Sequence, residues 1–334
     1  MGSQTSQRIA FWDNAKAILI LLVVIGHFLL PISPKGTIVF STYTWIYLFH
    51  MPAFVFVSGY FSKQYVAKGA SDVKRLIGFL VLYLLFSVAI WIIRMVCNRD
   101  ISMIFIFTPS GAPWYLMCMF IWYCIIPYCD KIRPIIMMAL SMLAGLLIGL
   151  EWQAGDFLAL SRCFVFFPFF VLGYHFDYKL ITGAKPYKRI ISGILLIAVF
   201  IAICLFPDFF VKHTNVMYGD SAYTRFASGL FERFIWYISA MIIVLAFLHV
   251  IPQKRCFFTY IGQRTMVIYI IHRLIRDICQ YLGFYKILPS DFWALVICIA
   301  FSAVITFLLS AKGLTDLFNK VFNARYSLLL KERN

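Results

Sequence analysis

The chain has 334 residues, of which 63% are apolar and only 13% are charged, and its mean hydropathy is +0.87. Average soluble domains are roughly half apolar and about a quarter charged, so this composition excludes an ordinary soluble domain and predicts an integral membrane protein. The formal net charge of +16 could indicate a nucleic-acid partner. The basic residues, however, lie between the apolar segments, where a membrane protein carries them.

Ten apolar segments follow one another along the chain, separated by Gly, Pro and charged residues. The sequence therefore predicts an all-α protein with about ten transmembrane helices, at 15–32, 44–62, 76–96, 113–128, 134–150, 160–176, 190–206, 233–251, 257–273 and 292–311. We expect a single membrane domain over residues 1–334 with no separate soluble domain, and a short structured segment within the loop 207–232.

The Lys and Arg residues are unevenly divided between the two sides that these spans define. With the N-terminus inside, 19 of them fall on the inner side, nine on the outer side, and two within spans. This positive-inside distribution predicts that both termini are cytoplasmic. The same distribution accounts for the net positive charge, because anionic lipid headgroups are sufficient partners for most of these basic residues. No nucleic-acid partner is therefore expected.

Ionisable residues inside spans are costly and tend to be functional. Asp13, Asn14 and Lys16 open the first span at its cytoplasmic end, and His27 lies 11 residues further on, about 16 Å deeper. His50 of the second span is expected at a similar depth in the outer half. A neutral imidazole among apolar side chains can act as a general base on a hydroxyl, so His27 is the candidate catalytic residue.

Further polar residues are expected in the same outer layer. His272 lies near the predicted end of the ninth span, Arg162 near the start of the sixth, and Glu151 and Asp156 on the connection before it. Together they predict a polar pocket that opens outward. For His50, His272 and Arg162 the alternative is a purely structural role, in which each side chain snorkels or bonds a neighbouring helix.

A second group is expected at the inner face, where Lys16 approaches Lys74 and Arg75. Cationic side chains together with free backbone amides at helix starts form phosphate-binding sites. The alternative is that these charges only reflect the positive-inside distribution.

Five stretches of sequence together resemble the acyltransferase-3 family of membrane acyltransferases, over residues 8–311. They are Trp12-Asp13 followed by Lys16-x10-His27, the run from His50 through Ser58-Gly59-Tyr60, Pro113-Trp114-Tyr115-Leu116, Arg162 through Gly173-Tyr174, and Ile261-Gly262-Gln263-Arg264-Thr265 through His272. The fucose 4-O-acetylase-like branch is the most similar.

The resemblance implies an acyl-CoA donor, usually acetyl-CoA, loaded from the cytoplasm, and a sugar hydroxyl of a surface glycan or glycolipid as acceptor. The Arg-x10-His motif of the family corresponds to Lys16 and His27, and a lysine keeps the charge but loses the bidentate fork of arginine. The family's basic pair after the second span reads Asp72-Val73-Lys74-Arg75 here, so only Arg75 carries over and the part of Lys74 is open.

The predicted mechanism places the CoA phosphates on Lys16, Lys74 and Arg75 and the thioester near His27. Asp13, Asn14, His50, Ser58, Trp114, Glu151, Arg162 and His272 are the candidate supporting or acceptor-binding residues. His27 would take the proton of the acceptor hydroxyl, with direct transfer and a transient acyl-histidine both open. No metal is expected, because the histidines fall on separate spans.

Two other functions stay open. A secondary transporter or flippase would also use ten spans and intramembrane histidines, although it predicts two related halves that the sequence does not show. Within enzymes, the acceptor could be an amine or a lipid. The expected setting is a bacterial cytoplasmic membrane, with the bilayer, the acyl-CoA and the glycan acceptor as partners and a homo-oligomer as a further option.

Overall fold

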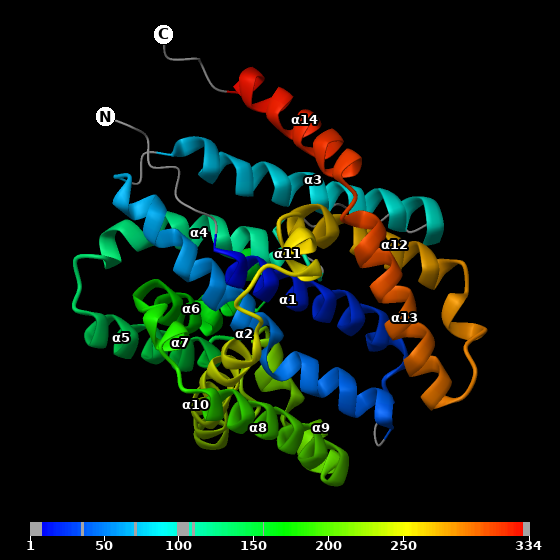
Figure 1. Ribbon diagram of the computed structural model, residues 1–334, viewed down its shortest axis with the longest axis horizontal. Helices are drawn as coiled ribbons and strands as arrows, with labels where there is room; N and C mark the ends of the chain where they lie inside the picture. Colours follow the sequence, from blue (N-terminus) through cyan, green and yellow to red (C-terminus); the bar gives the residue numbers. More distant parts are fainter. Residues whose placement is uncertain are drawn as a thin grey trace.

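The structure is a computed structural model that describes residues 9–34, 37–69, 72–98, 107–108, 111–155 and 157–329. The described residues form helices and connecting turns, which confirms the all-α membrane class (Figure 1). Seven helices are long and apolar enough to cross a bilayer, and two shorter apolar helices accompany them. The total of ten crossings, the cytoplasmic side of the termini and the single domain stay predictions.

Every predicted span coincides with helical structure. The helices are α1 Ala10–Leu29, α2 Ile38–Ala67, α3 Val73–Asn98, α4 Trp114–Cys129, α5 Pro134–Leu147, α6 Leu160–His175, α7 Lys179–Thr182, α8 Pro186–Leu205, α9 Pro207–Tyr218, α10 Phe226–Val250, α11 Phe257–Gly262, α12 Thr265–Tyr281, α13 Asp291–Leu309 and α14 Lys312–Leu329. Helix α9 confirms the structured segment expected within the loop 207–232.

Three boundaries differ from the sequence expectation. The ninth span is two helices, because the chain leaves helical geometry between Gly262 and Thr265, and α12 then continues to Tyr281. His272 therefore lies in the middle of α12 and not near its end. Helix α2 begins at Ile38, so His50 lies 12 residues into it, and the C-terminal segment forms the additional helix α14.

Helix α1 occupies the centre of the bundle, with α2, α11, α12 and α13 packed around it (Figure 1). Helix α1 is apolar on nearly all sides, and its central position buries these sides. Leu19, Val24 and Phe28, for example, are fully buried. Helix α3 packs beside α12, and the two run in the same direction, since their first turns share one pocket and their last turns another. These neighbours of α1 position the candidate site.

Helices α2 and α6 cross at two glycines, in the manner of small-residue contacts between membrane helices. A Cβ on Gly59 would overlap the backbone carbonyl of Phe170, and a Cβ on Gly173 would overlap that of Phe56. Each glycine thus lies on the other helix's backbone. The packing is fixed by main-chain atoms that cannot rotate away.

We expect Gly173→Ala to lower the free energy of unfolding by about 1–3 kcal/mol, because the added methyl forces α2 and α6 apart. Thermal unfolding in detergent, followed by tryptophan fluorescence, measures the effect. Gly193→Ala in α8 is the matched control, since a Cβ there meets nothing within 4 Å, and alanine is the better helix former. Equal melting temperatures for the two variants would contradict the close crossing.

Candidate functional site

The first turn of α1 is held to the segment 252–263 by its polar residues. Asn14 donates from Nδ2 to the carbonyls of Pro252 and Lys254, at 2.8 and 2.9 Å, and its Oδ1 accepts from the Thr259 hydroxyl at 2.6 Å. Gly262 packs directly on the carbonyl of Asp13, where a side chain would not fit. Asn14, predicted as a supporting residue, thus positions α11 and the break that follows it.

Asp13 and Lys16 form an ion pair on α1, with 2.9 Å between Nζ and Oδ1. The Asp13 carboxylate is buried, and Gln263 approaches its other oxygen through Nε2 at 3.5 Å. The Lys16 ammonium lies 5.2 Å from the ring centroid of Phe61. This pairing fixes the direction of the Lys16 side chain at the edge of a pocket.

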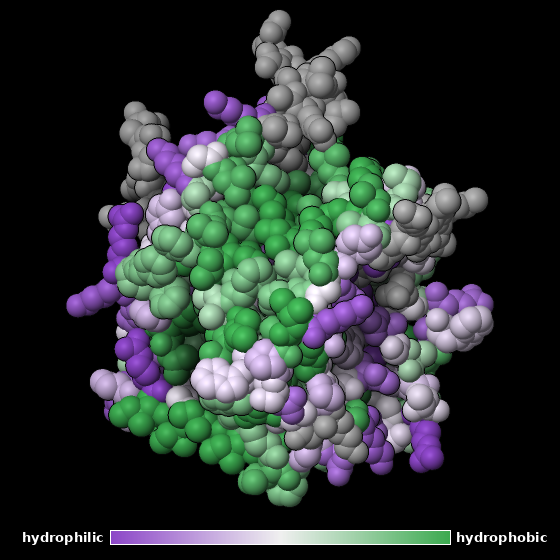
Figure 2. Space-filling model, turned by 90° about the vertical axis from the view of Figure 1, so that its right-hand side faces the viewer, coloured by the Kyte–Doolittle hydropathy of each residue, from purple (hydrophilic) through white to green (hydrophobic). Residues whose placement is uncertain are grey.

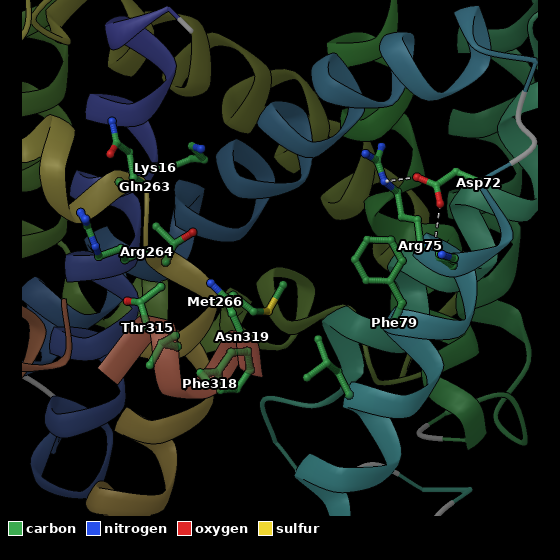
Figure 3. Close-up of a pocket in the computed structure, with 16 residues that line it drawn as sticks. Lys16, Asp72, Arg75, Phe79, Gln263, Arg264, Met266, Thr315, Phe318 and Asn319 are labelled. Atoms are coloured by element: carbon green, nitrogen blue, oxygen red, sulfur yellow. Dashed lines mark hydrogen bonds and ion pairs between the residues drawn. The ribbon is translucent and has the colours of Figure 1, made fainter. Parts of the chain in front are cut away.

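The pocket beside Lys16 has a volume of about 510 Å³ and brings together the three residues predicted to bind the acyl donor. Lys16, Lys74 and Arg75 all line it, together with Arg264 from the helix break, and we call it the basic pocket. Figure 3 shows Lys16, Gln263 and Arg264 on one side, Asp72, Arg75 and Phe79 on the other, and residues of α14 between them.

Two helices begin at the basic pocket, α3 at Val73 and α12 at Thr265. Helix starts present unpaired amides and a partial positive charge. Asp72 caps the start of α3, since its Oδ1 accepts from the Arg75 amide at 3.1 Å, and it lies 3.6 Å from the Arg75 guanidinium. Side chains and helix starts together make the pocket suited to phosphate groups.

A smaller, mostly apolar cavity continues from the basic pocket into the bundle. It has a volume of about 200 Å³, and Lys16, Phe79, Thr265 and Met266 line both spaces. Deeper in, its walls are aromatic and apolar residues of α1, α2, α4 and α12, namely Val23, Met51, Phe54, Val57, Phe61, Tyr115, Met119, Tyr123 and Tyr269. We call it the aromatic chamber.

Ser58, another predicted supporting residue, also lines the aromatic chamber. Its hydroxyl donates to the Phe54 carbonyl at 2.9 Å and lies 2.5 Å from the Tyr115 hydroxyl. Because the single hydroxyl proton of Ser58 is used by the carbonyl, Tyr115 is the donor to Ser58. The pair provides a fixed polar point in an otherwise apolar cavity.

The chamber ends beside two histidines. Val23 lies one helical turn before His27 on α1, and Tyr269 lies one turn before His272 on α12. The rings of His27 and His272 are 5.2 Å apart, edge to face, and His27 is half-buried while His272 is fully buried. The contact between α1 and α12, which could not be predicted from the sequence, thus brings His27 and His272 together.

The hydrogen bond at Nδ1 of His272 decides which of its ring nitrogens carries the proton in the neutral imidazole. Its Nδ1 lies 2.7 Å from the Ile268 carbonyl, so this nitrogen carries the proton and donates it. Its Nε2 is then an acceptor, and it is buried without a hydrogen-bond partner in the described part of the chain. In the neutral imidazole, a free lone pair on Nε2 thus lies next to His27.

His50 belongs to the same group. Its Nδ1 lies 2.8 Å from the Ile46 carbonyl, its ring is 4.7 Å from that of Tyr47, and it acts electrostatically on His27, as do Arg273 and Arg276. The structure therefore brings His27, His50 and His272 together in one group.

Beyond the histidines, a polar pocket of about 590 Å³ lies between the last turns of α3 and α12. It is lined by Ile93, Arg94, Cys97, Arg273, Arg276, Asp277, Gln280 and Tyr281, and we call it the arginine pocket. The predicted ninth span ends at Arg273, so Arg276 and Asp277 fell outside it and no pocket was predicted here. The signal that would have found the pocket is the spacing of Arg273, Arg276 and Asp277, one, four and five residues after His272.

Arg162 and Trp114, two further predicted residues, lie beside each other at the starts of α6 and α4. Arg162 at the start of α6 forms an ion pair with Asp220, and its guanidinium lies 5.5 Å from the Trp114 ring. Its Nε donates to the carbonyl of Tyr218 at 3.3 Å. Arg162 thus anchors the turn after α9.

That turn leads back to the histidines through tyrosines. The Tyr218 hydroxyl bonds that of Tyr43, burial raises the pKa of Tyr218 above its ordinary value, and its ring lies 5.5 Å from that of Tyr47, the neighbour of His50. Arg162 therefore reaches the histidine layer through intermediate side chains.

The structure does not bring Glu151 to His27. Glu151 is exposed, and its carboxylate accepts from the Gln153 amide at 2.9 Å in its own loop. Asp156, expected near it, lies outside the described residues. The groups that act electrostatically on His27 are the imidazoles of His272 and His50 and the guanidinium groups of Arg273 and Arg276.

Comparisons with known proteins identify the family of the chain. The model of the family described as "Acyltransferase domain" matches residues 9–311. A curated relative, "Nodulation protein NolL" of Mesorhizobium japonicum, is 45% identical over 62 residues, which are 18% of this chain and 17% of that protein. The chain thus matches under a fifth of that relative's length, and no solved structure matches it. Because the family model covers nearly all the described helices, the chain belongs to the acyltransferase-3 family, and its apolar helices are those of a multi-pass membrane protein.

Proposed function

We propose that this protein transfers an acetyl or other short acyl group from cytoplasmic acyl-CoA to a hydroxyl group of a surface glycan or lipid-linked sugar. The observation that carries the proposal is the row of spaces along α1. The basic pocket opens at Lys16, the aromatic chamber follows, and the His27 and His272 pair lies at its end.

The two connected cavities suit the two parts of CoA. Lys16, Lys74, Arg75 and Arg264 would hold the phosphates, aided by the start of α12. The pantetheine arm would lie in the aromatic chamber. Lys16 and His27 are 11 residues apart on one helix, about 16 Å along its axis, a length that an extended pantetheine arm covers.

The chemistry would be general base catalysis by His27. Its imidazole takes the proton of the acceptor hydroxyl as the oxygen attacks the thioester carbonyl. The C–S bond then breaks, and the imidazolium returns the proton to the departing CoA thiolate. His272, with its free Nε2 acceptor, would orient the His27 ring. A route through a transient acyl-histidine uses the same residue as nucleophile.

This reaction would join the two sides of a bacterial cytoplasmic membrane, with the donor bound on the inner side and the acceptor on the outer side. The positive-inside distribution supports that orientation, and the start of α1 and the helix α14 line the same pocket, as an even number of crossings requires. The similarity to the fucose 4-O-acetylase-like branch supports a sugar acceptor.

The test is release of free CoA from acetyl-CoA by the purified protein in nanodiscs, with and without a bacterial glycolipid extract. We expect release that the extract stimulates, together with acetyl transfer to a glycan detected by mass spectrometry. Folded protein that neither binds nor turns over any acyl-CoA would overturn the proposal. Flux of a solute into liposomes without CoA release would instead indicate a transporter.

A further inference from the structure

Basic side chains outnumber acidic ones among the described residues that line the arginine pocket. Arg94, Arg273 and Arg276 line it, and Asp277 is the one acidic residue among these described lining residues. The side chains of Arg273, Arg276 and Asp277 are only 9–11% exposed, so solvent screens these charges little. Arg273 and Arg276 share the single carboxylate of Asp277, so this group carries one positive charge in excess, which is costly at such a place.

Not every guanidinium donor of Arg273 and Arg276 has a partner in the described part of the chain. Arg273 and Arg276 both bond the same oxygen of Asp277 through Nη1, the latter at 2.8 Å. The Nε group of each is buried and has no hydrogen-bond partner among the described residues. The edge of a guanidinium that includes Nε is one that a carboxylate or phosphate binds with two parallel hydrogen bonds. In Arg273 this edge lies against Gly111, since a Cβ on that glycine would be 3.3 Å from both Nε and Nη2, so Arg276 is the residue that offers this edge to a ligand.

The arginine pocket lies next to the histidines, on the side away from the basic pocket. Arg273 follows His272 directly in α12, and Arg273 and Arg276 both act electrostatically on His27. The pocket lies at the opposite end of α3 and α12 from the basic pocket. Figure 2 views the molecule from the end where these helices finish and shows hydrophilic patches within a largely hydrophobic surface. A molecule in the arginine pocket thus approaches His27 from the side away from the donor.

We propose that the arginine pocket binds an anionic group of the acceptor, a carboxylate or phosphate on or next to the sugar that carries the reacting hydroxyl. The acceptor is then an acidic glycan or a phosphate-linked sugar, held by the Nε edge of Arg276 beside the Arg273 guanidinium while its hydroxyl reaches His27. This inference rests on the proposed function and adds the charge class of its acceptor.

The first experiment measures binding to the purified protein in phosphatidylcholine nanodiscs. The probes are methyl glucuronide and inorganic pyrophosphate, with methyl glucoside as the neutral control. We expect the anionic probes to raise the melting temperature and methyl glucoside to leave it unchanged. Equal shifts for methyl glucuronide and methyl glucoside, with none for pyrophosphate, would overturn the proposal without any variant.

The second experiment uses variants. We expect Arg276→Gln to weaken binding of the anionic probes roughly 10- to 100-fold, the amount that a charge-assisted pair of hydrogen bonds contributes, and Arg276→Lys to recover part of it. Lys286→Gln is the matched control, because it removes a positive charge from the exposed turn after α12, outside the pocket lining. If Arg276→Gln and Lys286→Gln lost the same amount of affinity for the anionic probes, binding would depend only on the overall positive charge of this end of the protein. That result would overturn the proposed site.

Two further measurements separate the possible failures. Nanodiscs of phosphatidylglycerol test a lipid headgroup as occupant, since competition by this lipid that abolishes probe binding would overturn the acceptor assignment. Acetyl-CoA affinity is measured in the same preparation. Donor binding without any preference for anionic probes contradicts this inference alone, whereas anion binding without donor binding contradicts the proposed function.

Discussion

Replacing His27 by alanine is expected to lower acyl transfer by 10²- to 10⁴-fold, the usual contribution of a general base. The imidazole is the one titratable group of α1 at the end of the aromatic chamber, and its neighbours Arg273 and Arg276 cannot accept a proton. Binding of acetyl-CoA is expected to survive, because the basic pocket lies about 16 Å away along α1. Steady-state CoA release and donor affinity, measured on one preparation, check both statements.

The control for His27 is His249→Ala. His249 also lies on an apolar helix, half-buried, with Nδ1 2.8 Å from a backbone carbonyl, but it lines none of the three cavities. It is expected to keep wild-type transfer. Mass spectrometry of protein quenched with labelled acetyl-CoA separates the two routes, since a label on His27 indicates an acyl-enzyme. Undiminished transfer by His27→Ala would remove this residue from the mechanism.

The positions of the helices were predictable because lipid imposes a simple requirement. A segment that crosses a bilayer must satisfy its backbone internally and present apolar side chains, so apolar length alone located all ten helical segments. The Lys16 and His27 spacing followed from the rise of a single helix, which needs no knowledge of the fold. The joint pocket of Lys16, Lys74 and Arg75 was also predicted, because all three lie at helix starts on one side.

Helix α12 shows where this reasoning fails. It is surrounded by protein along one face, so it tolerates Arg273, Arg276 and Asp277, and a hydropathy criterion ends the span at the first of them. The pairing of His27 with His272 depends on the contact between α1 and α12, residues almost 250 positions apart. Neither spacing nor composition carries that information. The arginine pocket was missed for the same reason.

The combined variant Lys74→Ala, Arg75→Ala and Arg264→Ala is expected to raise the KM for acetyl-CoA by about 10²-fold, since each charge-assisted contact to a phosphate contributes about tenfold or more. The Arg75 side chain is 41% exposed, so solvent screening makes its contribution to the KM smaller than that of a buried contact. Lys16 is left in place, because its removal would strand the buried Asp13 carboxylate.

The decisive comparison for this variant is acetyl-pantetheine, which carries the thioester and the arm but no phosphate. Because the three side chains would act only on phosphate groups, the variant and the wild type should use acetyl-pantetheine with equal KM, while the wild type alone prefers acetyl-CoA. High salt should narrow that preference in the wild type. Lys179→Ala with Lys188→Ala is the control, since both residues are exposed and lie outside the pocket. An unchanged KM for acetyl-CoA in the triple variant would move the CoA phosphates elsewhere on the protein.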